Sequence, residues 1–344
     1  MGRRIIGVKD VAREAGVSLG TVSNVLNRPE IVAATTRTRV LSVIDSLGYV
    51  RAEGARLRES ASRVLAVMVP DLTNPFFAAL ASGVERAARE AGLSVMVCTG
   101  ARDPAESARH MALMSSHQVR GAVLSCGEGI GTTVSAFRRN AVPFVVADQH
   151  APQPGASSVG VDDVTGGRLA VRHLVERGHR SIVHVSGPDR LQQIRDRRRG
   201  ARAAVTAAGL APTALRELSC DGLTVAAGRE AGHRVLALAD RPTAVLCAND
   251  LLALGVMQAL YTAGLRIPDD IALVGHDDIE FAGSAVVPLT TVARPAAAMG
   301  LHAGRLLVED TCGGGPREPR HVVLRPELVV RESTGGCRSA GAGL

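Results

Sequence analysis

The chain has 344 residues, which is more than one compact domain holds, so we expect two or three domains. Hydrophobic residues make up 46% of the chain, yet no apolar run reaches the roughly 18 residues of a membrane span. The N-terminus lacks the apolar core of a signal peptide, so we expect a cytoplasmic protein. The net charge is +7, and the six cysteines are far apart without zinc spacing, so we expect neither disulfides nor a metal site.

Positive charge is concentrated at the start of the chain. Residues 1–63 hold eleven Arg and Lys residues against six Asp and Glu residues. Lys9 is the only lysine, so a single arginine is weak evidence for a site and the clustering carries the argument. A basic segment of this kind is suited to the phosphates of nucleic acid.

Two short amphipathic helices are expected between Val8 and Asn27. Gly16 can adopt the positive φ that ends the first helix, and Ser18 is a favourable N-cap for the second. The pattern predicts a helix-turn-helix, whose second helix enters the DNA major groove, although an ordinary surface helical hairpin has the same spacing. Apolar residues recur at helical spacing in both halves, at Val8, Val11, Ala12 and Ala15 and then at Val22, Val25 and Leu26.

A third helix is expected from about Ala34 to Leu47, and Gly48 ends it. With the first two helices it would form a core too small to make the unit very stable by itself. We expect residues 1–50 to form the DNA-binding domain and residues 51–63 to form a hinge. The predicted buried face of the third helix comprises Val40, Leu41, Ile44 and Leu47.

From Val64 onward, apolar strands alternate with helices, and the pattern restarts near residue 157. This alternation predicts parallel sheets with right-handed crossovers, and two such units predict two doubly wound α/β lobes with a cleft between them. We expect the first lobe to contain residues 64–162 and about 293–321. The second lobe would contain residues 163–292 and about 322–335, followed by a tail at 336–344.

Ligands of open parallel sheets bind beyond the carboxyl ends of the strands. The predicted strands therefore nominate the loops at 71–76, 126–130, 147–150, 187–197, 248–250 and 276–278. Their polar groups could converge on a hydroxyl-rich small molecule, or each could satisfy backbone groups of its own loop. The candidates are Asn74, Phe76, Asp148, Gln149, Arg190, Arg197, Asn249 and Asp277.

The stretch VKDVAREAGVSLGTVSNVLN resembles the N-terminal signature of the LacI-type transcription regulators. The resemblance continues to about residue 335 through PDLTNPFF, AND, VGHDD and LTTV. It implies a body like the periplasmic binding proteins, a homodimer, a near-palindromic double-stranded DNA operator and a small-molecule effector acting allosterically.

The resemblance assigns base reading to three residues of the second helix. Asn24 can pair with adenine through two hydrogen bonds and Leu19 can touch a thymine methyl, whereas Gly20 has no side chain to read with. Phosphate contacts are expected from Ser18, Thr21, Ser23 and Asn27.

In the hinge, Ala55 and Arg56 match the family, but Leu57 comes one residue early and Arg58 occupies the usual place of the leucine. The hinge is then shorter, or uses another minor-groove wedge, or is a flexible linker. We therefore expect DNA contacts from Arg56, Leu57 and Arg58.

In the cleft, the resemblance selects Asn74, Phe76, Asp148, Arg197, Asn249 and Asp277. Asp148, Asn249 and Asp277 would accept hydrogen bonds from hydroxyls and Arg197 would donate, while Asp250 and Asp278 would cap the helix or loop behind. Leu223 stands where the family often has an aromatic residue, so stacking falls to Phe76 or Phe77 and favours a sugar or polyol over a purine.

Catalysis and cofactors are not expected. The chain contains no phosphate-binding GxxxxGK[ST] loop and no GxGxxG after a strand. His184 lies in the middle of a predicted strand and is expected to be a core residue. We predict a ligand-responsive DNA-binding regulator, a repressor, in the cytoplasm of a bacterium with its nucleoid. The alternative is a solute-binding sensor of the same body fold without a DNA role.

Overall fold

A computed structural model of the chain describes residues 8–27, 31–47, 63–99, 109–114, 119–125, 127, 130–149, 155–312 and 318–335. Within these ranges, no helix combines the length and the apolarity needed to cross a bilayer. The hinge residues Arg56, Leu57 and Arg58 and the tail at 336–344 lie outside the described residues, as do the side chains of Leu26, Asn27 and Leu47.

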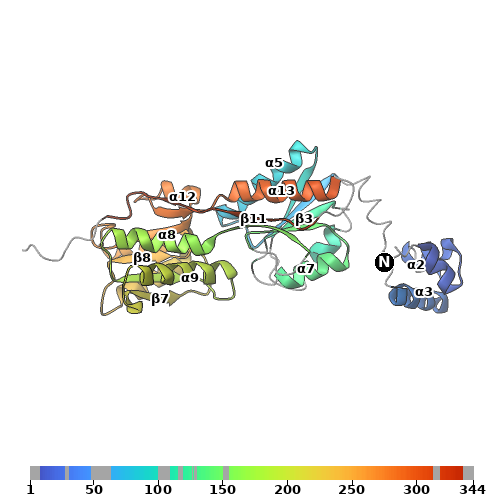
Figure 1. Ribbon diagram of the computed structural model, residues 1–344, viewed down its shortest axis with the longest axis horizontal. Coiled ribbons are helices and arrows are strands. Elements are labelled where there is room, and N and C mark those ends of the chain that lie inside the picture. The colour runs from blue at the N-terminus through green and yellow to red at the C-terminus, as the bar shows by residue number, and fades with distance from the viewer. Residues whose placement is uncertain are drawn as a thin grey trace, which may run out of the picture.

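The N-terminal unit is the predicted helix-turn-helix with a third helix behind it (Figure 1). It consists of α1 (Val8–Ala15), α2 (Leu19–Asn27) and α3 (Ala34–Leu47). Gly16 ends α1 with φ 62°, and Ser18 Oγ accepts a hydrogen bond from the Thr21 amide at 3.1 Å at the start of α2. The shared core contains Val11, Ala12, Ala15, Val22, Val25 and Val40.

The predicted buried face of α3 is wrong at Leu41, whose side chain is 45% exposed. Val40 is fully buried, and Val43 and Ile44 pack partly buried against the same core. Positions three and four residues after Val40 share its face of the helix, whereas the next residue points about 100° away. Among the described side chains, the face is therefore Val40, Val43 and Ile44.

The first lobe is a parallel sheet covered by helices on both faces, with strand order β11-β5-β4-β3-β1-β2. One core lies under α5 and α13, and the other lies under α7, as the opposite positions of these helices in Figure 1 show. Its elements are β1 (Val64–Val69), α5 (Pro75–Glu90), β2 (Ser94–Thr99), β3 (Gly121–Leu124), α7 (Ile130–Arg139), β4 (Phe144–Ala147), β5 (Ser157–Val161), α13 (Ala296–Cys312) and β11 (His321–Leu324).

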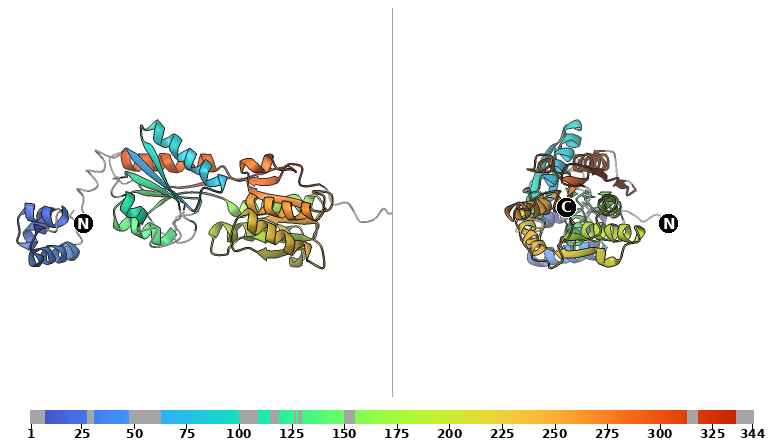
Figure 2. Two further views of the ribbon diagram at one scale, coloured as in Figure 1. Left: turned by 180° about the vertical axis from the view of Figure 1, so that it is seen from behind. Right: turned by 90° about the vertical axis from the view of Figure 1, so that its left-hand side faces the viewer.

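The second lobe repeats this design, with strand order β12-β10-β9-β8-β6-β7. Helices α8 and α9 cover the face seen in Figure 1, and α10 and α11 cover the face seen from behind in Figure 2. Its elements are α8 (Asp163–Glu176), β6 (Ile182–Ser186), α9 (Gln192–Ala207), η2 (Pro212–Ala214), β7 (Leu215–Ser219), α10 (Val225–Leu236), β8 (Ala244–Cys247), α11 (Asp250–Thr262), β9 (Ala272–Asp277), α12 (Glu280–Gly283), β10 (Thr290–Ala293) and β12 (Glu327–Val329). The doubly wound, two-lobed class is confirmed.

The C-terminal part of the chain departs from the expected arrangement in two ways. Residues 322–324, expected in the second lobe, belong to β11 of the first sheet, where they pair with β5. β12 then joins the second sheet antiparallel to β10. Both are short edge strands with half-exposed residues, so they lack the continuous apolar run that marks the central strands. The chain thus crosses between the lobes after β5, after β10 and after β11.

Three helix pairs of the body are in backbone contact at glycines. On α8 and α9, a Cβ added to Gly167 would lie 1.9 Å from Arg197 O, and one added to Gly200 would lie 1.8 Å from Val164 O. The pairs α5/α13 and α10/α11 meet in the same way, at Gly83 with Gly300 and at Gly228 with Gly255. Glycine inside a helix costs about 1 kcal/mol relative to alanine, and here it allows the close approach that sets the position of Arg197 on α9.

Candidate functional site

A cleft of about 250 Å³ lies between loops that follow the strands of both lobes. Gln149 is half-buried and is not among the residues that line it. Arg190, Leu223 and Phe77 also line the cleft, together with Arg294, which the sequence did not suggest. The other six candidate effector residues line it: Asn74, Phe76, Asp148, Arg197, Asn249 and Asp277.

Asn74 and Phe76 are held at the start of α5. Asn74 is its N-cap, and its Oδ1 accepts a hydrogen bond from the Phe76 amide at 3.0 Å. The Asn74 amide N–H groups are donors that could bond to a ligand. The Phe76 ring contacts Phe77 edge-on, with 5.4 Å between centroids. These residues give the first lobe an aromatic wall beside a hydrogen-bond donor.

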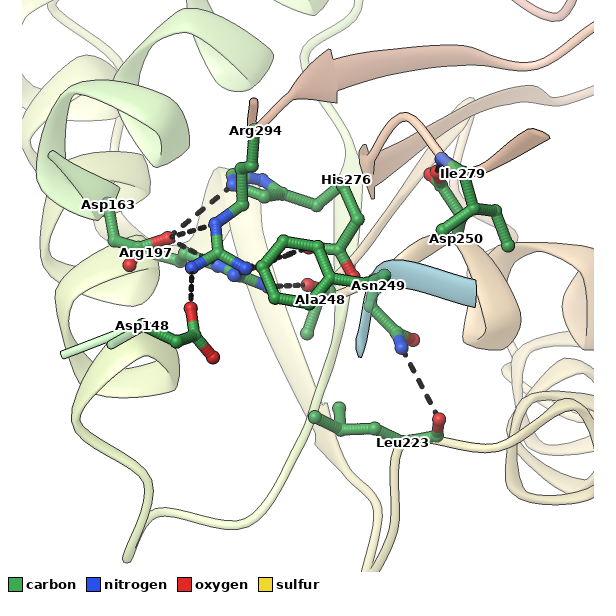
Figure 3. Close-up of polar contacts among 12 residues, drawn as sticks. Asp148, Asp163, Arg197, Leu223, Ala248, Asn249, Asp250, His276, Ile279 and Arg294 are labelled. Carbon is green, nitrogen blue, oxygen red and sulfur yellow. Dashed lines mark hydrogen bonds and ion pairs between the residues drawn. The ribbon is translucent and has the colours of Figure 1, made fainter. Parts of the chain in front are cut away.

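A buried ion cluster, which we define as Asp148, Asp163, Arg197, Asp277 and Arg294, lies at the floor of the cleft, and all of its members except Asp163 line the cleft (Figure 3). Arg294 donates to Asp148 and to Asp277, the latter at 3.2 Å, and its Nε lies 3.4 Å from Asp163 Oδ1. Arg197 Nε donates to Asp163 Oδ1 at 2.9 Å, and Arg197 Nη2 lies 3.5 Å from Asp277 Oδ1. Two guanidinium groups thus share three carboxylates.

Burial is the dominant influence on the titration of this cluster. It raises the pKa of Asp148 and of Asp277, and the adjacent arginines offset the rise only in part. Burial also acts to raise the pKa of Asp163, but Arg294 and Arg197 outweigh it and hold that pKa well below its usual value. Burial and Arg197 lower the pKa of His276, beside Asp163, to about 3, so His276 is neutral at pH 7.

The sequence reasoning missed Arg294, Asp163 and His276. Arg294 directly follows β10, and Asp163 follows β5 at the first crossing between the lobes. The rule that nominated the other loops would have found both if it had been applied to the crossover segments. His276 lies in β9 beside Asp277, within the nominated range 276–278, but was not singled out as a candidate.

Asn249 caps α11 in addition to lining the cleft, whereas Asp250 bonds to the loop behind, as expected. Asn249 is the N-cap of α11: its Oδ1 accepts from the Leu252 amide at 2.9 Å and its Nδ2 donates to Leu223 O at 3.3 Å. One lone pair of its oxygen is therefore committed to the helix. The buried Asp250 carboxyl instead accepts from Thr291 Oγ1 at 2.6 Å and from the Ile279 amide at 2.9 Å.

We expect Asp250→Asn to change how stability depends on pH. Burial, reinforced by Asp277, raises the pKa of Asp250 to about 8, whereas the unfolded carboxyl ionises near pH ~4. Between these values the folded state binds more protons, so the free energy of unfolding falls as the pH rises. Asparagine stays neutral and can still accept from Ile279 and donate to Thr291. The melting temperature of the variant minus that of the parent should therefore increase from pH 4 to pH 8. A difference that stays the same at every pH would contradict this expectation.

On the N-terminal unit, the predicted DNA-reading residues lie on the solvent side of α2. Leu19 is 47% exposed, and Gly20, Ser23 and Asn24 are also exposed. Thr21 is half-buried, and its Oγ1 lies 2.9 Å from Ser18 Oγ. The opposite side of α2 packs on α1 and α3 through Val22 and Val25, so the exposed side points away from the core, as a helix entering a DNA groove requires.

His184 is confirmed as a core residue of β6, with a side chain 1% exposed. Burial lowers its pKa to about 4. Asp278, expected as a cap, accepts a hydrogen bond from Arg331 at 2.7 Å and so ties the segment after β12 to the loop after β9.

Two family profiles match the chain: "Bacterial regulatory proteins, lacI family" over residues 7–52, and "Periplasmic binding protein-like domain" over residues 171–334. The chain is 32% identical to the transcriptional repressor PurR of Photobacterium profundum over 329 residues, covering 95% of this chain and 98% of the relative. It is 36% identical to the ribose operon repressor of Escherichia coli, covering 95% and 99%.

Two solved structures of similar fold cover nearly the whole chain. A complex of the transcriptional regulator CelR with cellobiose has a TM-score of 0.72 at 32% identity, covering 96% of this chain and 100% of that one. The lac repressor dimer bound to operator and the anti-inducer ONPF has a TM-score of 0.70 at 28% identity, with the same coverage.

Proposed function

The chain belongs to the lacI family of bacterial regulatory proteins, and we propose that it is a repressor whose operator affinity is controlled by a sugar or related polyol bound in the cleft. It is a DNA-binding transcriptional regulator and not an enzyme. The observation that carries the proposal is the cleft itself, in which carboxylates from both lobes meet beside an aromatic wall. Because its target is the chromosome, we place the protein in the cytoplasm with the nucleoid.

DNA binding requires two copies of the N-terminal unit. A homodimer would place the two α2 helices in successive major grooves, about one helical turn apart, so the operator should be near-palindromic. Exposed Leu19 and Asn24 would read base edges, while Ser18, Thr21, Ser23 and Asn27 would contact phosphates. Arg56, Leu57 and Arg58 would add contacts from the hinge.

Effector control requires that the ligand bind two states of the body unequally. Asp148 and Phe76 belong to the first lobe, whereas Asn249 and Asp277 belong to the second, so a ligand contacting both lobes stabilises their closed arrangement. Closure would shift the first lobes relative to each other in the dimer and alter the spacing of the two hinges. An inducer would favour the DNA-free state and a co-repressor the DNA-bound state.

We expect Asp148→Ala and Asp277→Ala each to abolish or strongly reduce the thermal shift produced by the effector. Each variant removes a carboxylate acceptor from the cleft, and a ligand that binds only the native state raises its melting temperature. The measurement is a thermal-shift screen of sugars, polyols and nucleosides with the full chain, followed by the active compounds with both variants.

The matched control is Asp240→Ala, which removes an exposed aspartate from the loop before β8. It should leave the shift unchanged. An undiminished shift in both cleft variants would refute this placement of the site, and a response to nucleosides alone would refute the sugar class.

A further inference from the structure

Arg294 stands apart from the other residues of the ion cluster because it contacts both lobes from a segment that connects them. It follows β10 and precedes α13, and it is 4% exposed. Its guanidinium carbon lies 4.5 Å from the centroid of the Phe76 ring. It also donates hydrogen bonds to Asp148 of the first lobe and Asp277 of the second. Figure 3 shows the guanidinium between the segments that carry Asp148 and Asp163.

This arrangement uses the groups that a sugar ring would use. A pyranose or furanose places an apolar face on an aromatic ring and donates its hydroxyls to carboxylates. Here the flat guanidinium of Arg294 lies over Phe76, and one oxygen of Asp148 and one of Asp277 accept from it. The chain itself therefore fills the innermost place of the cleft, and each carboxylate keeps one oxygen for a ligand.

The remaining space is small. The cleft measures about 250 Å³, below the roughly 300–1,000 Å³ typical of ligand sites. Arg294 is also held firmly, because moving it aside would leave a buried cation and three buried carboxylates with fewer partners. A ligand must therefore fit beside the guanidinium rather than replace it.

We propose that Arg294 is a specificity-determining residue of the cleft, filling its inner end and restricting the effector to a monosaccharide-sized ligand. The proposal rests on the proposed function, in which the cleft binds a sugar. The guanidinium N–H groups not used by the carboxylates would donate to the ring or hydroxyl oxygens of that ligand.

The test is isothermal titration of the full chain with aldopentoses and aldohexoses and with the disaccharides cellobiose, maltose and lactose. The parent should bind at least one monosaccharide, and each disaccharide roughly tenfold or more weakly, the scale of a steric mismatch. Arg294→Gln shortens and neutralises the side chain, so this preference should shrink or reverse. Arg294→Lys, which keeps the charge and loses the flat group, should weaken the preference and serves if Arg294→Gln does not fold.

The matched control is Arg305→Gln on α13, where the arginine is half-exposed and pairs with Glu90 at 3.1 Å outside the cleft. It should keep the parent's preference. Disaccharide binding by the parent as tight as its monosaccharide binding, or an unchanged preference in the folded Arg294 variants, overturns this proposal alone. Absence of any saccharide binding by the parent overturns the sugar effector and this proposal with it.

Discussion

Gly200→Ala is expected to destabilise the second lobe by about 3 kcal/mol, at the upper end for an overpacked core. The added Cβ would lie 1.8 Å from Val164 O and 2.9 Å from Arg168 N, and backbone atoms cannot rotate away as a side chain can. Helices α8 and α9 must therefore separate, and Arg197, three residues earlier, moves with α9. Urea unfolding monitored by circular dichroism should show a lower midpoint, and the effector should bind more weakly.

The control for this variant is Gly131→Ala in α7, where an added Cβ meets nothing within 4 Å. Alanine is the better helix former, so this variant should be as stable as the parent or more stable by up to about 1 kcal/mol. Equal stability of Gly200→Ala and Gly131→Ala would show that α8 and α9 are not in backbone contact.

Arg197→Met is expected to lower the free energy of unfolding by about 3 kcal/mol or more, because it leaves buried carboxylates with one guanidinium instead of two. Arg197 is 3% exposed, pairs with Asp163 and Asp277, and donates to Ala248 O. Methionine retains much of the side-chain volume, so the loss would come mainly from charge and hydrogen bonding. The measurement is again urea unfolding at neutral pH.

The pH dependence distinguishes this loss from a packing defect. The pKa of Asp163 is held below its unfolded value by Arg294 and Arg197, so Asp163 stabilises the fold above pH ~4 and this contribution fades as the pH falls toward its folded pKa. The difference between parent and Arg197→Met should therefore narrow on acidification. Adding Asp163→Asn to the variant should recover part of the loss at neutral pH, and a constant difference at every pH would contradict the account.

Local patterns predicted much of this fold. The apolar spacing of α1 and α2, the positive φ of Gly16 and the Ser18 cap depend on neighbours within a few residues, and all are found. The continuous apolar runs of the central strands likewise follow from burial on both faces. The half-exposed edge strand β11 carries no such run, so residues 322–324 were assigned to the wrong lobe.

The site was predictable to the level of loops but not of atoms. The rule for parallel sheets brought Asn74, Asp148 and Asp277 to one cleft. It could not show that Arg294, 146 positions after Asp148, pairs with it, because that contact depends on how the two lobes meet. The sequence also could not show that the Asp250 carboxyl bonds to Thr291 and Ile279, because these residues lie in other elements. Asn249 is the residue that caps α11.

The central claim is that paired N-terminal units bind duplex DNA and that the two-lobed body controls this binding. The most direct test selects an operator from random DNA with the full chain, and then measures binding by fluorescence anisotropy at two salt concentrations, with and without the effector. We predict a near-palindromic site, affinity that falls steeply with salt, an affinity change on adding effector, and an altered sequence preference in Asn24→Ala. Equal affinity for all sequences, or an operator affinity that the bound effector leaves unchanged, would contradict the account.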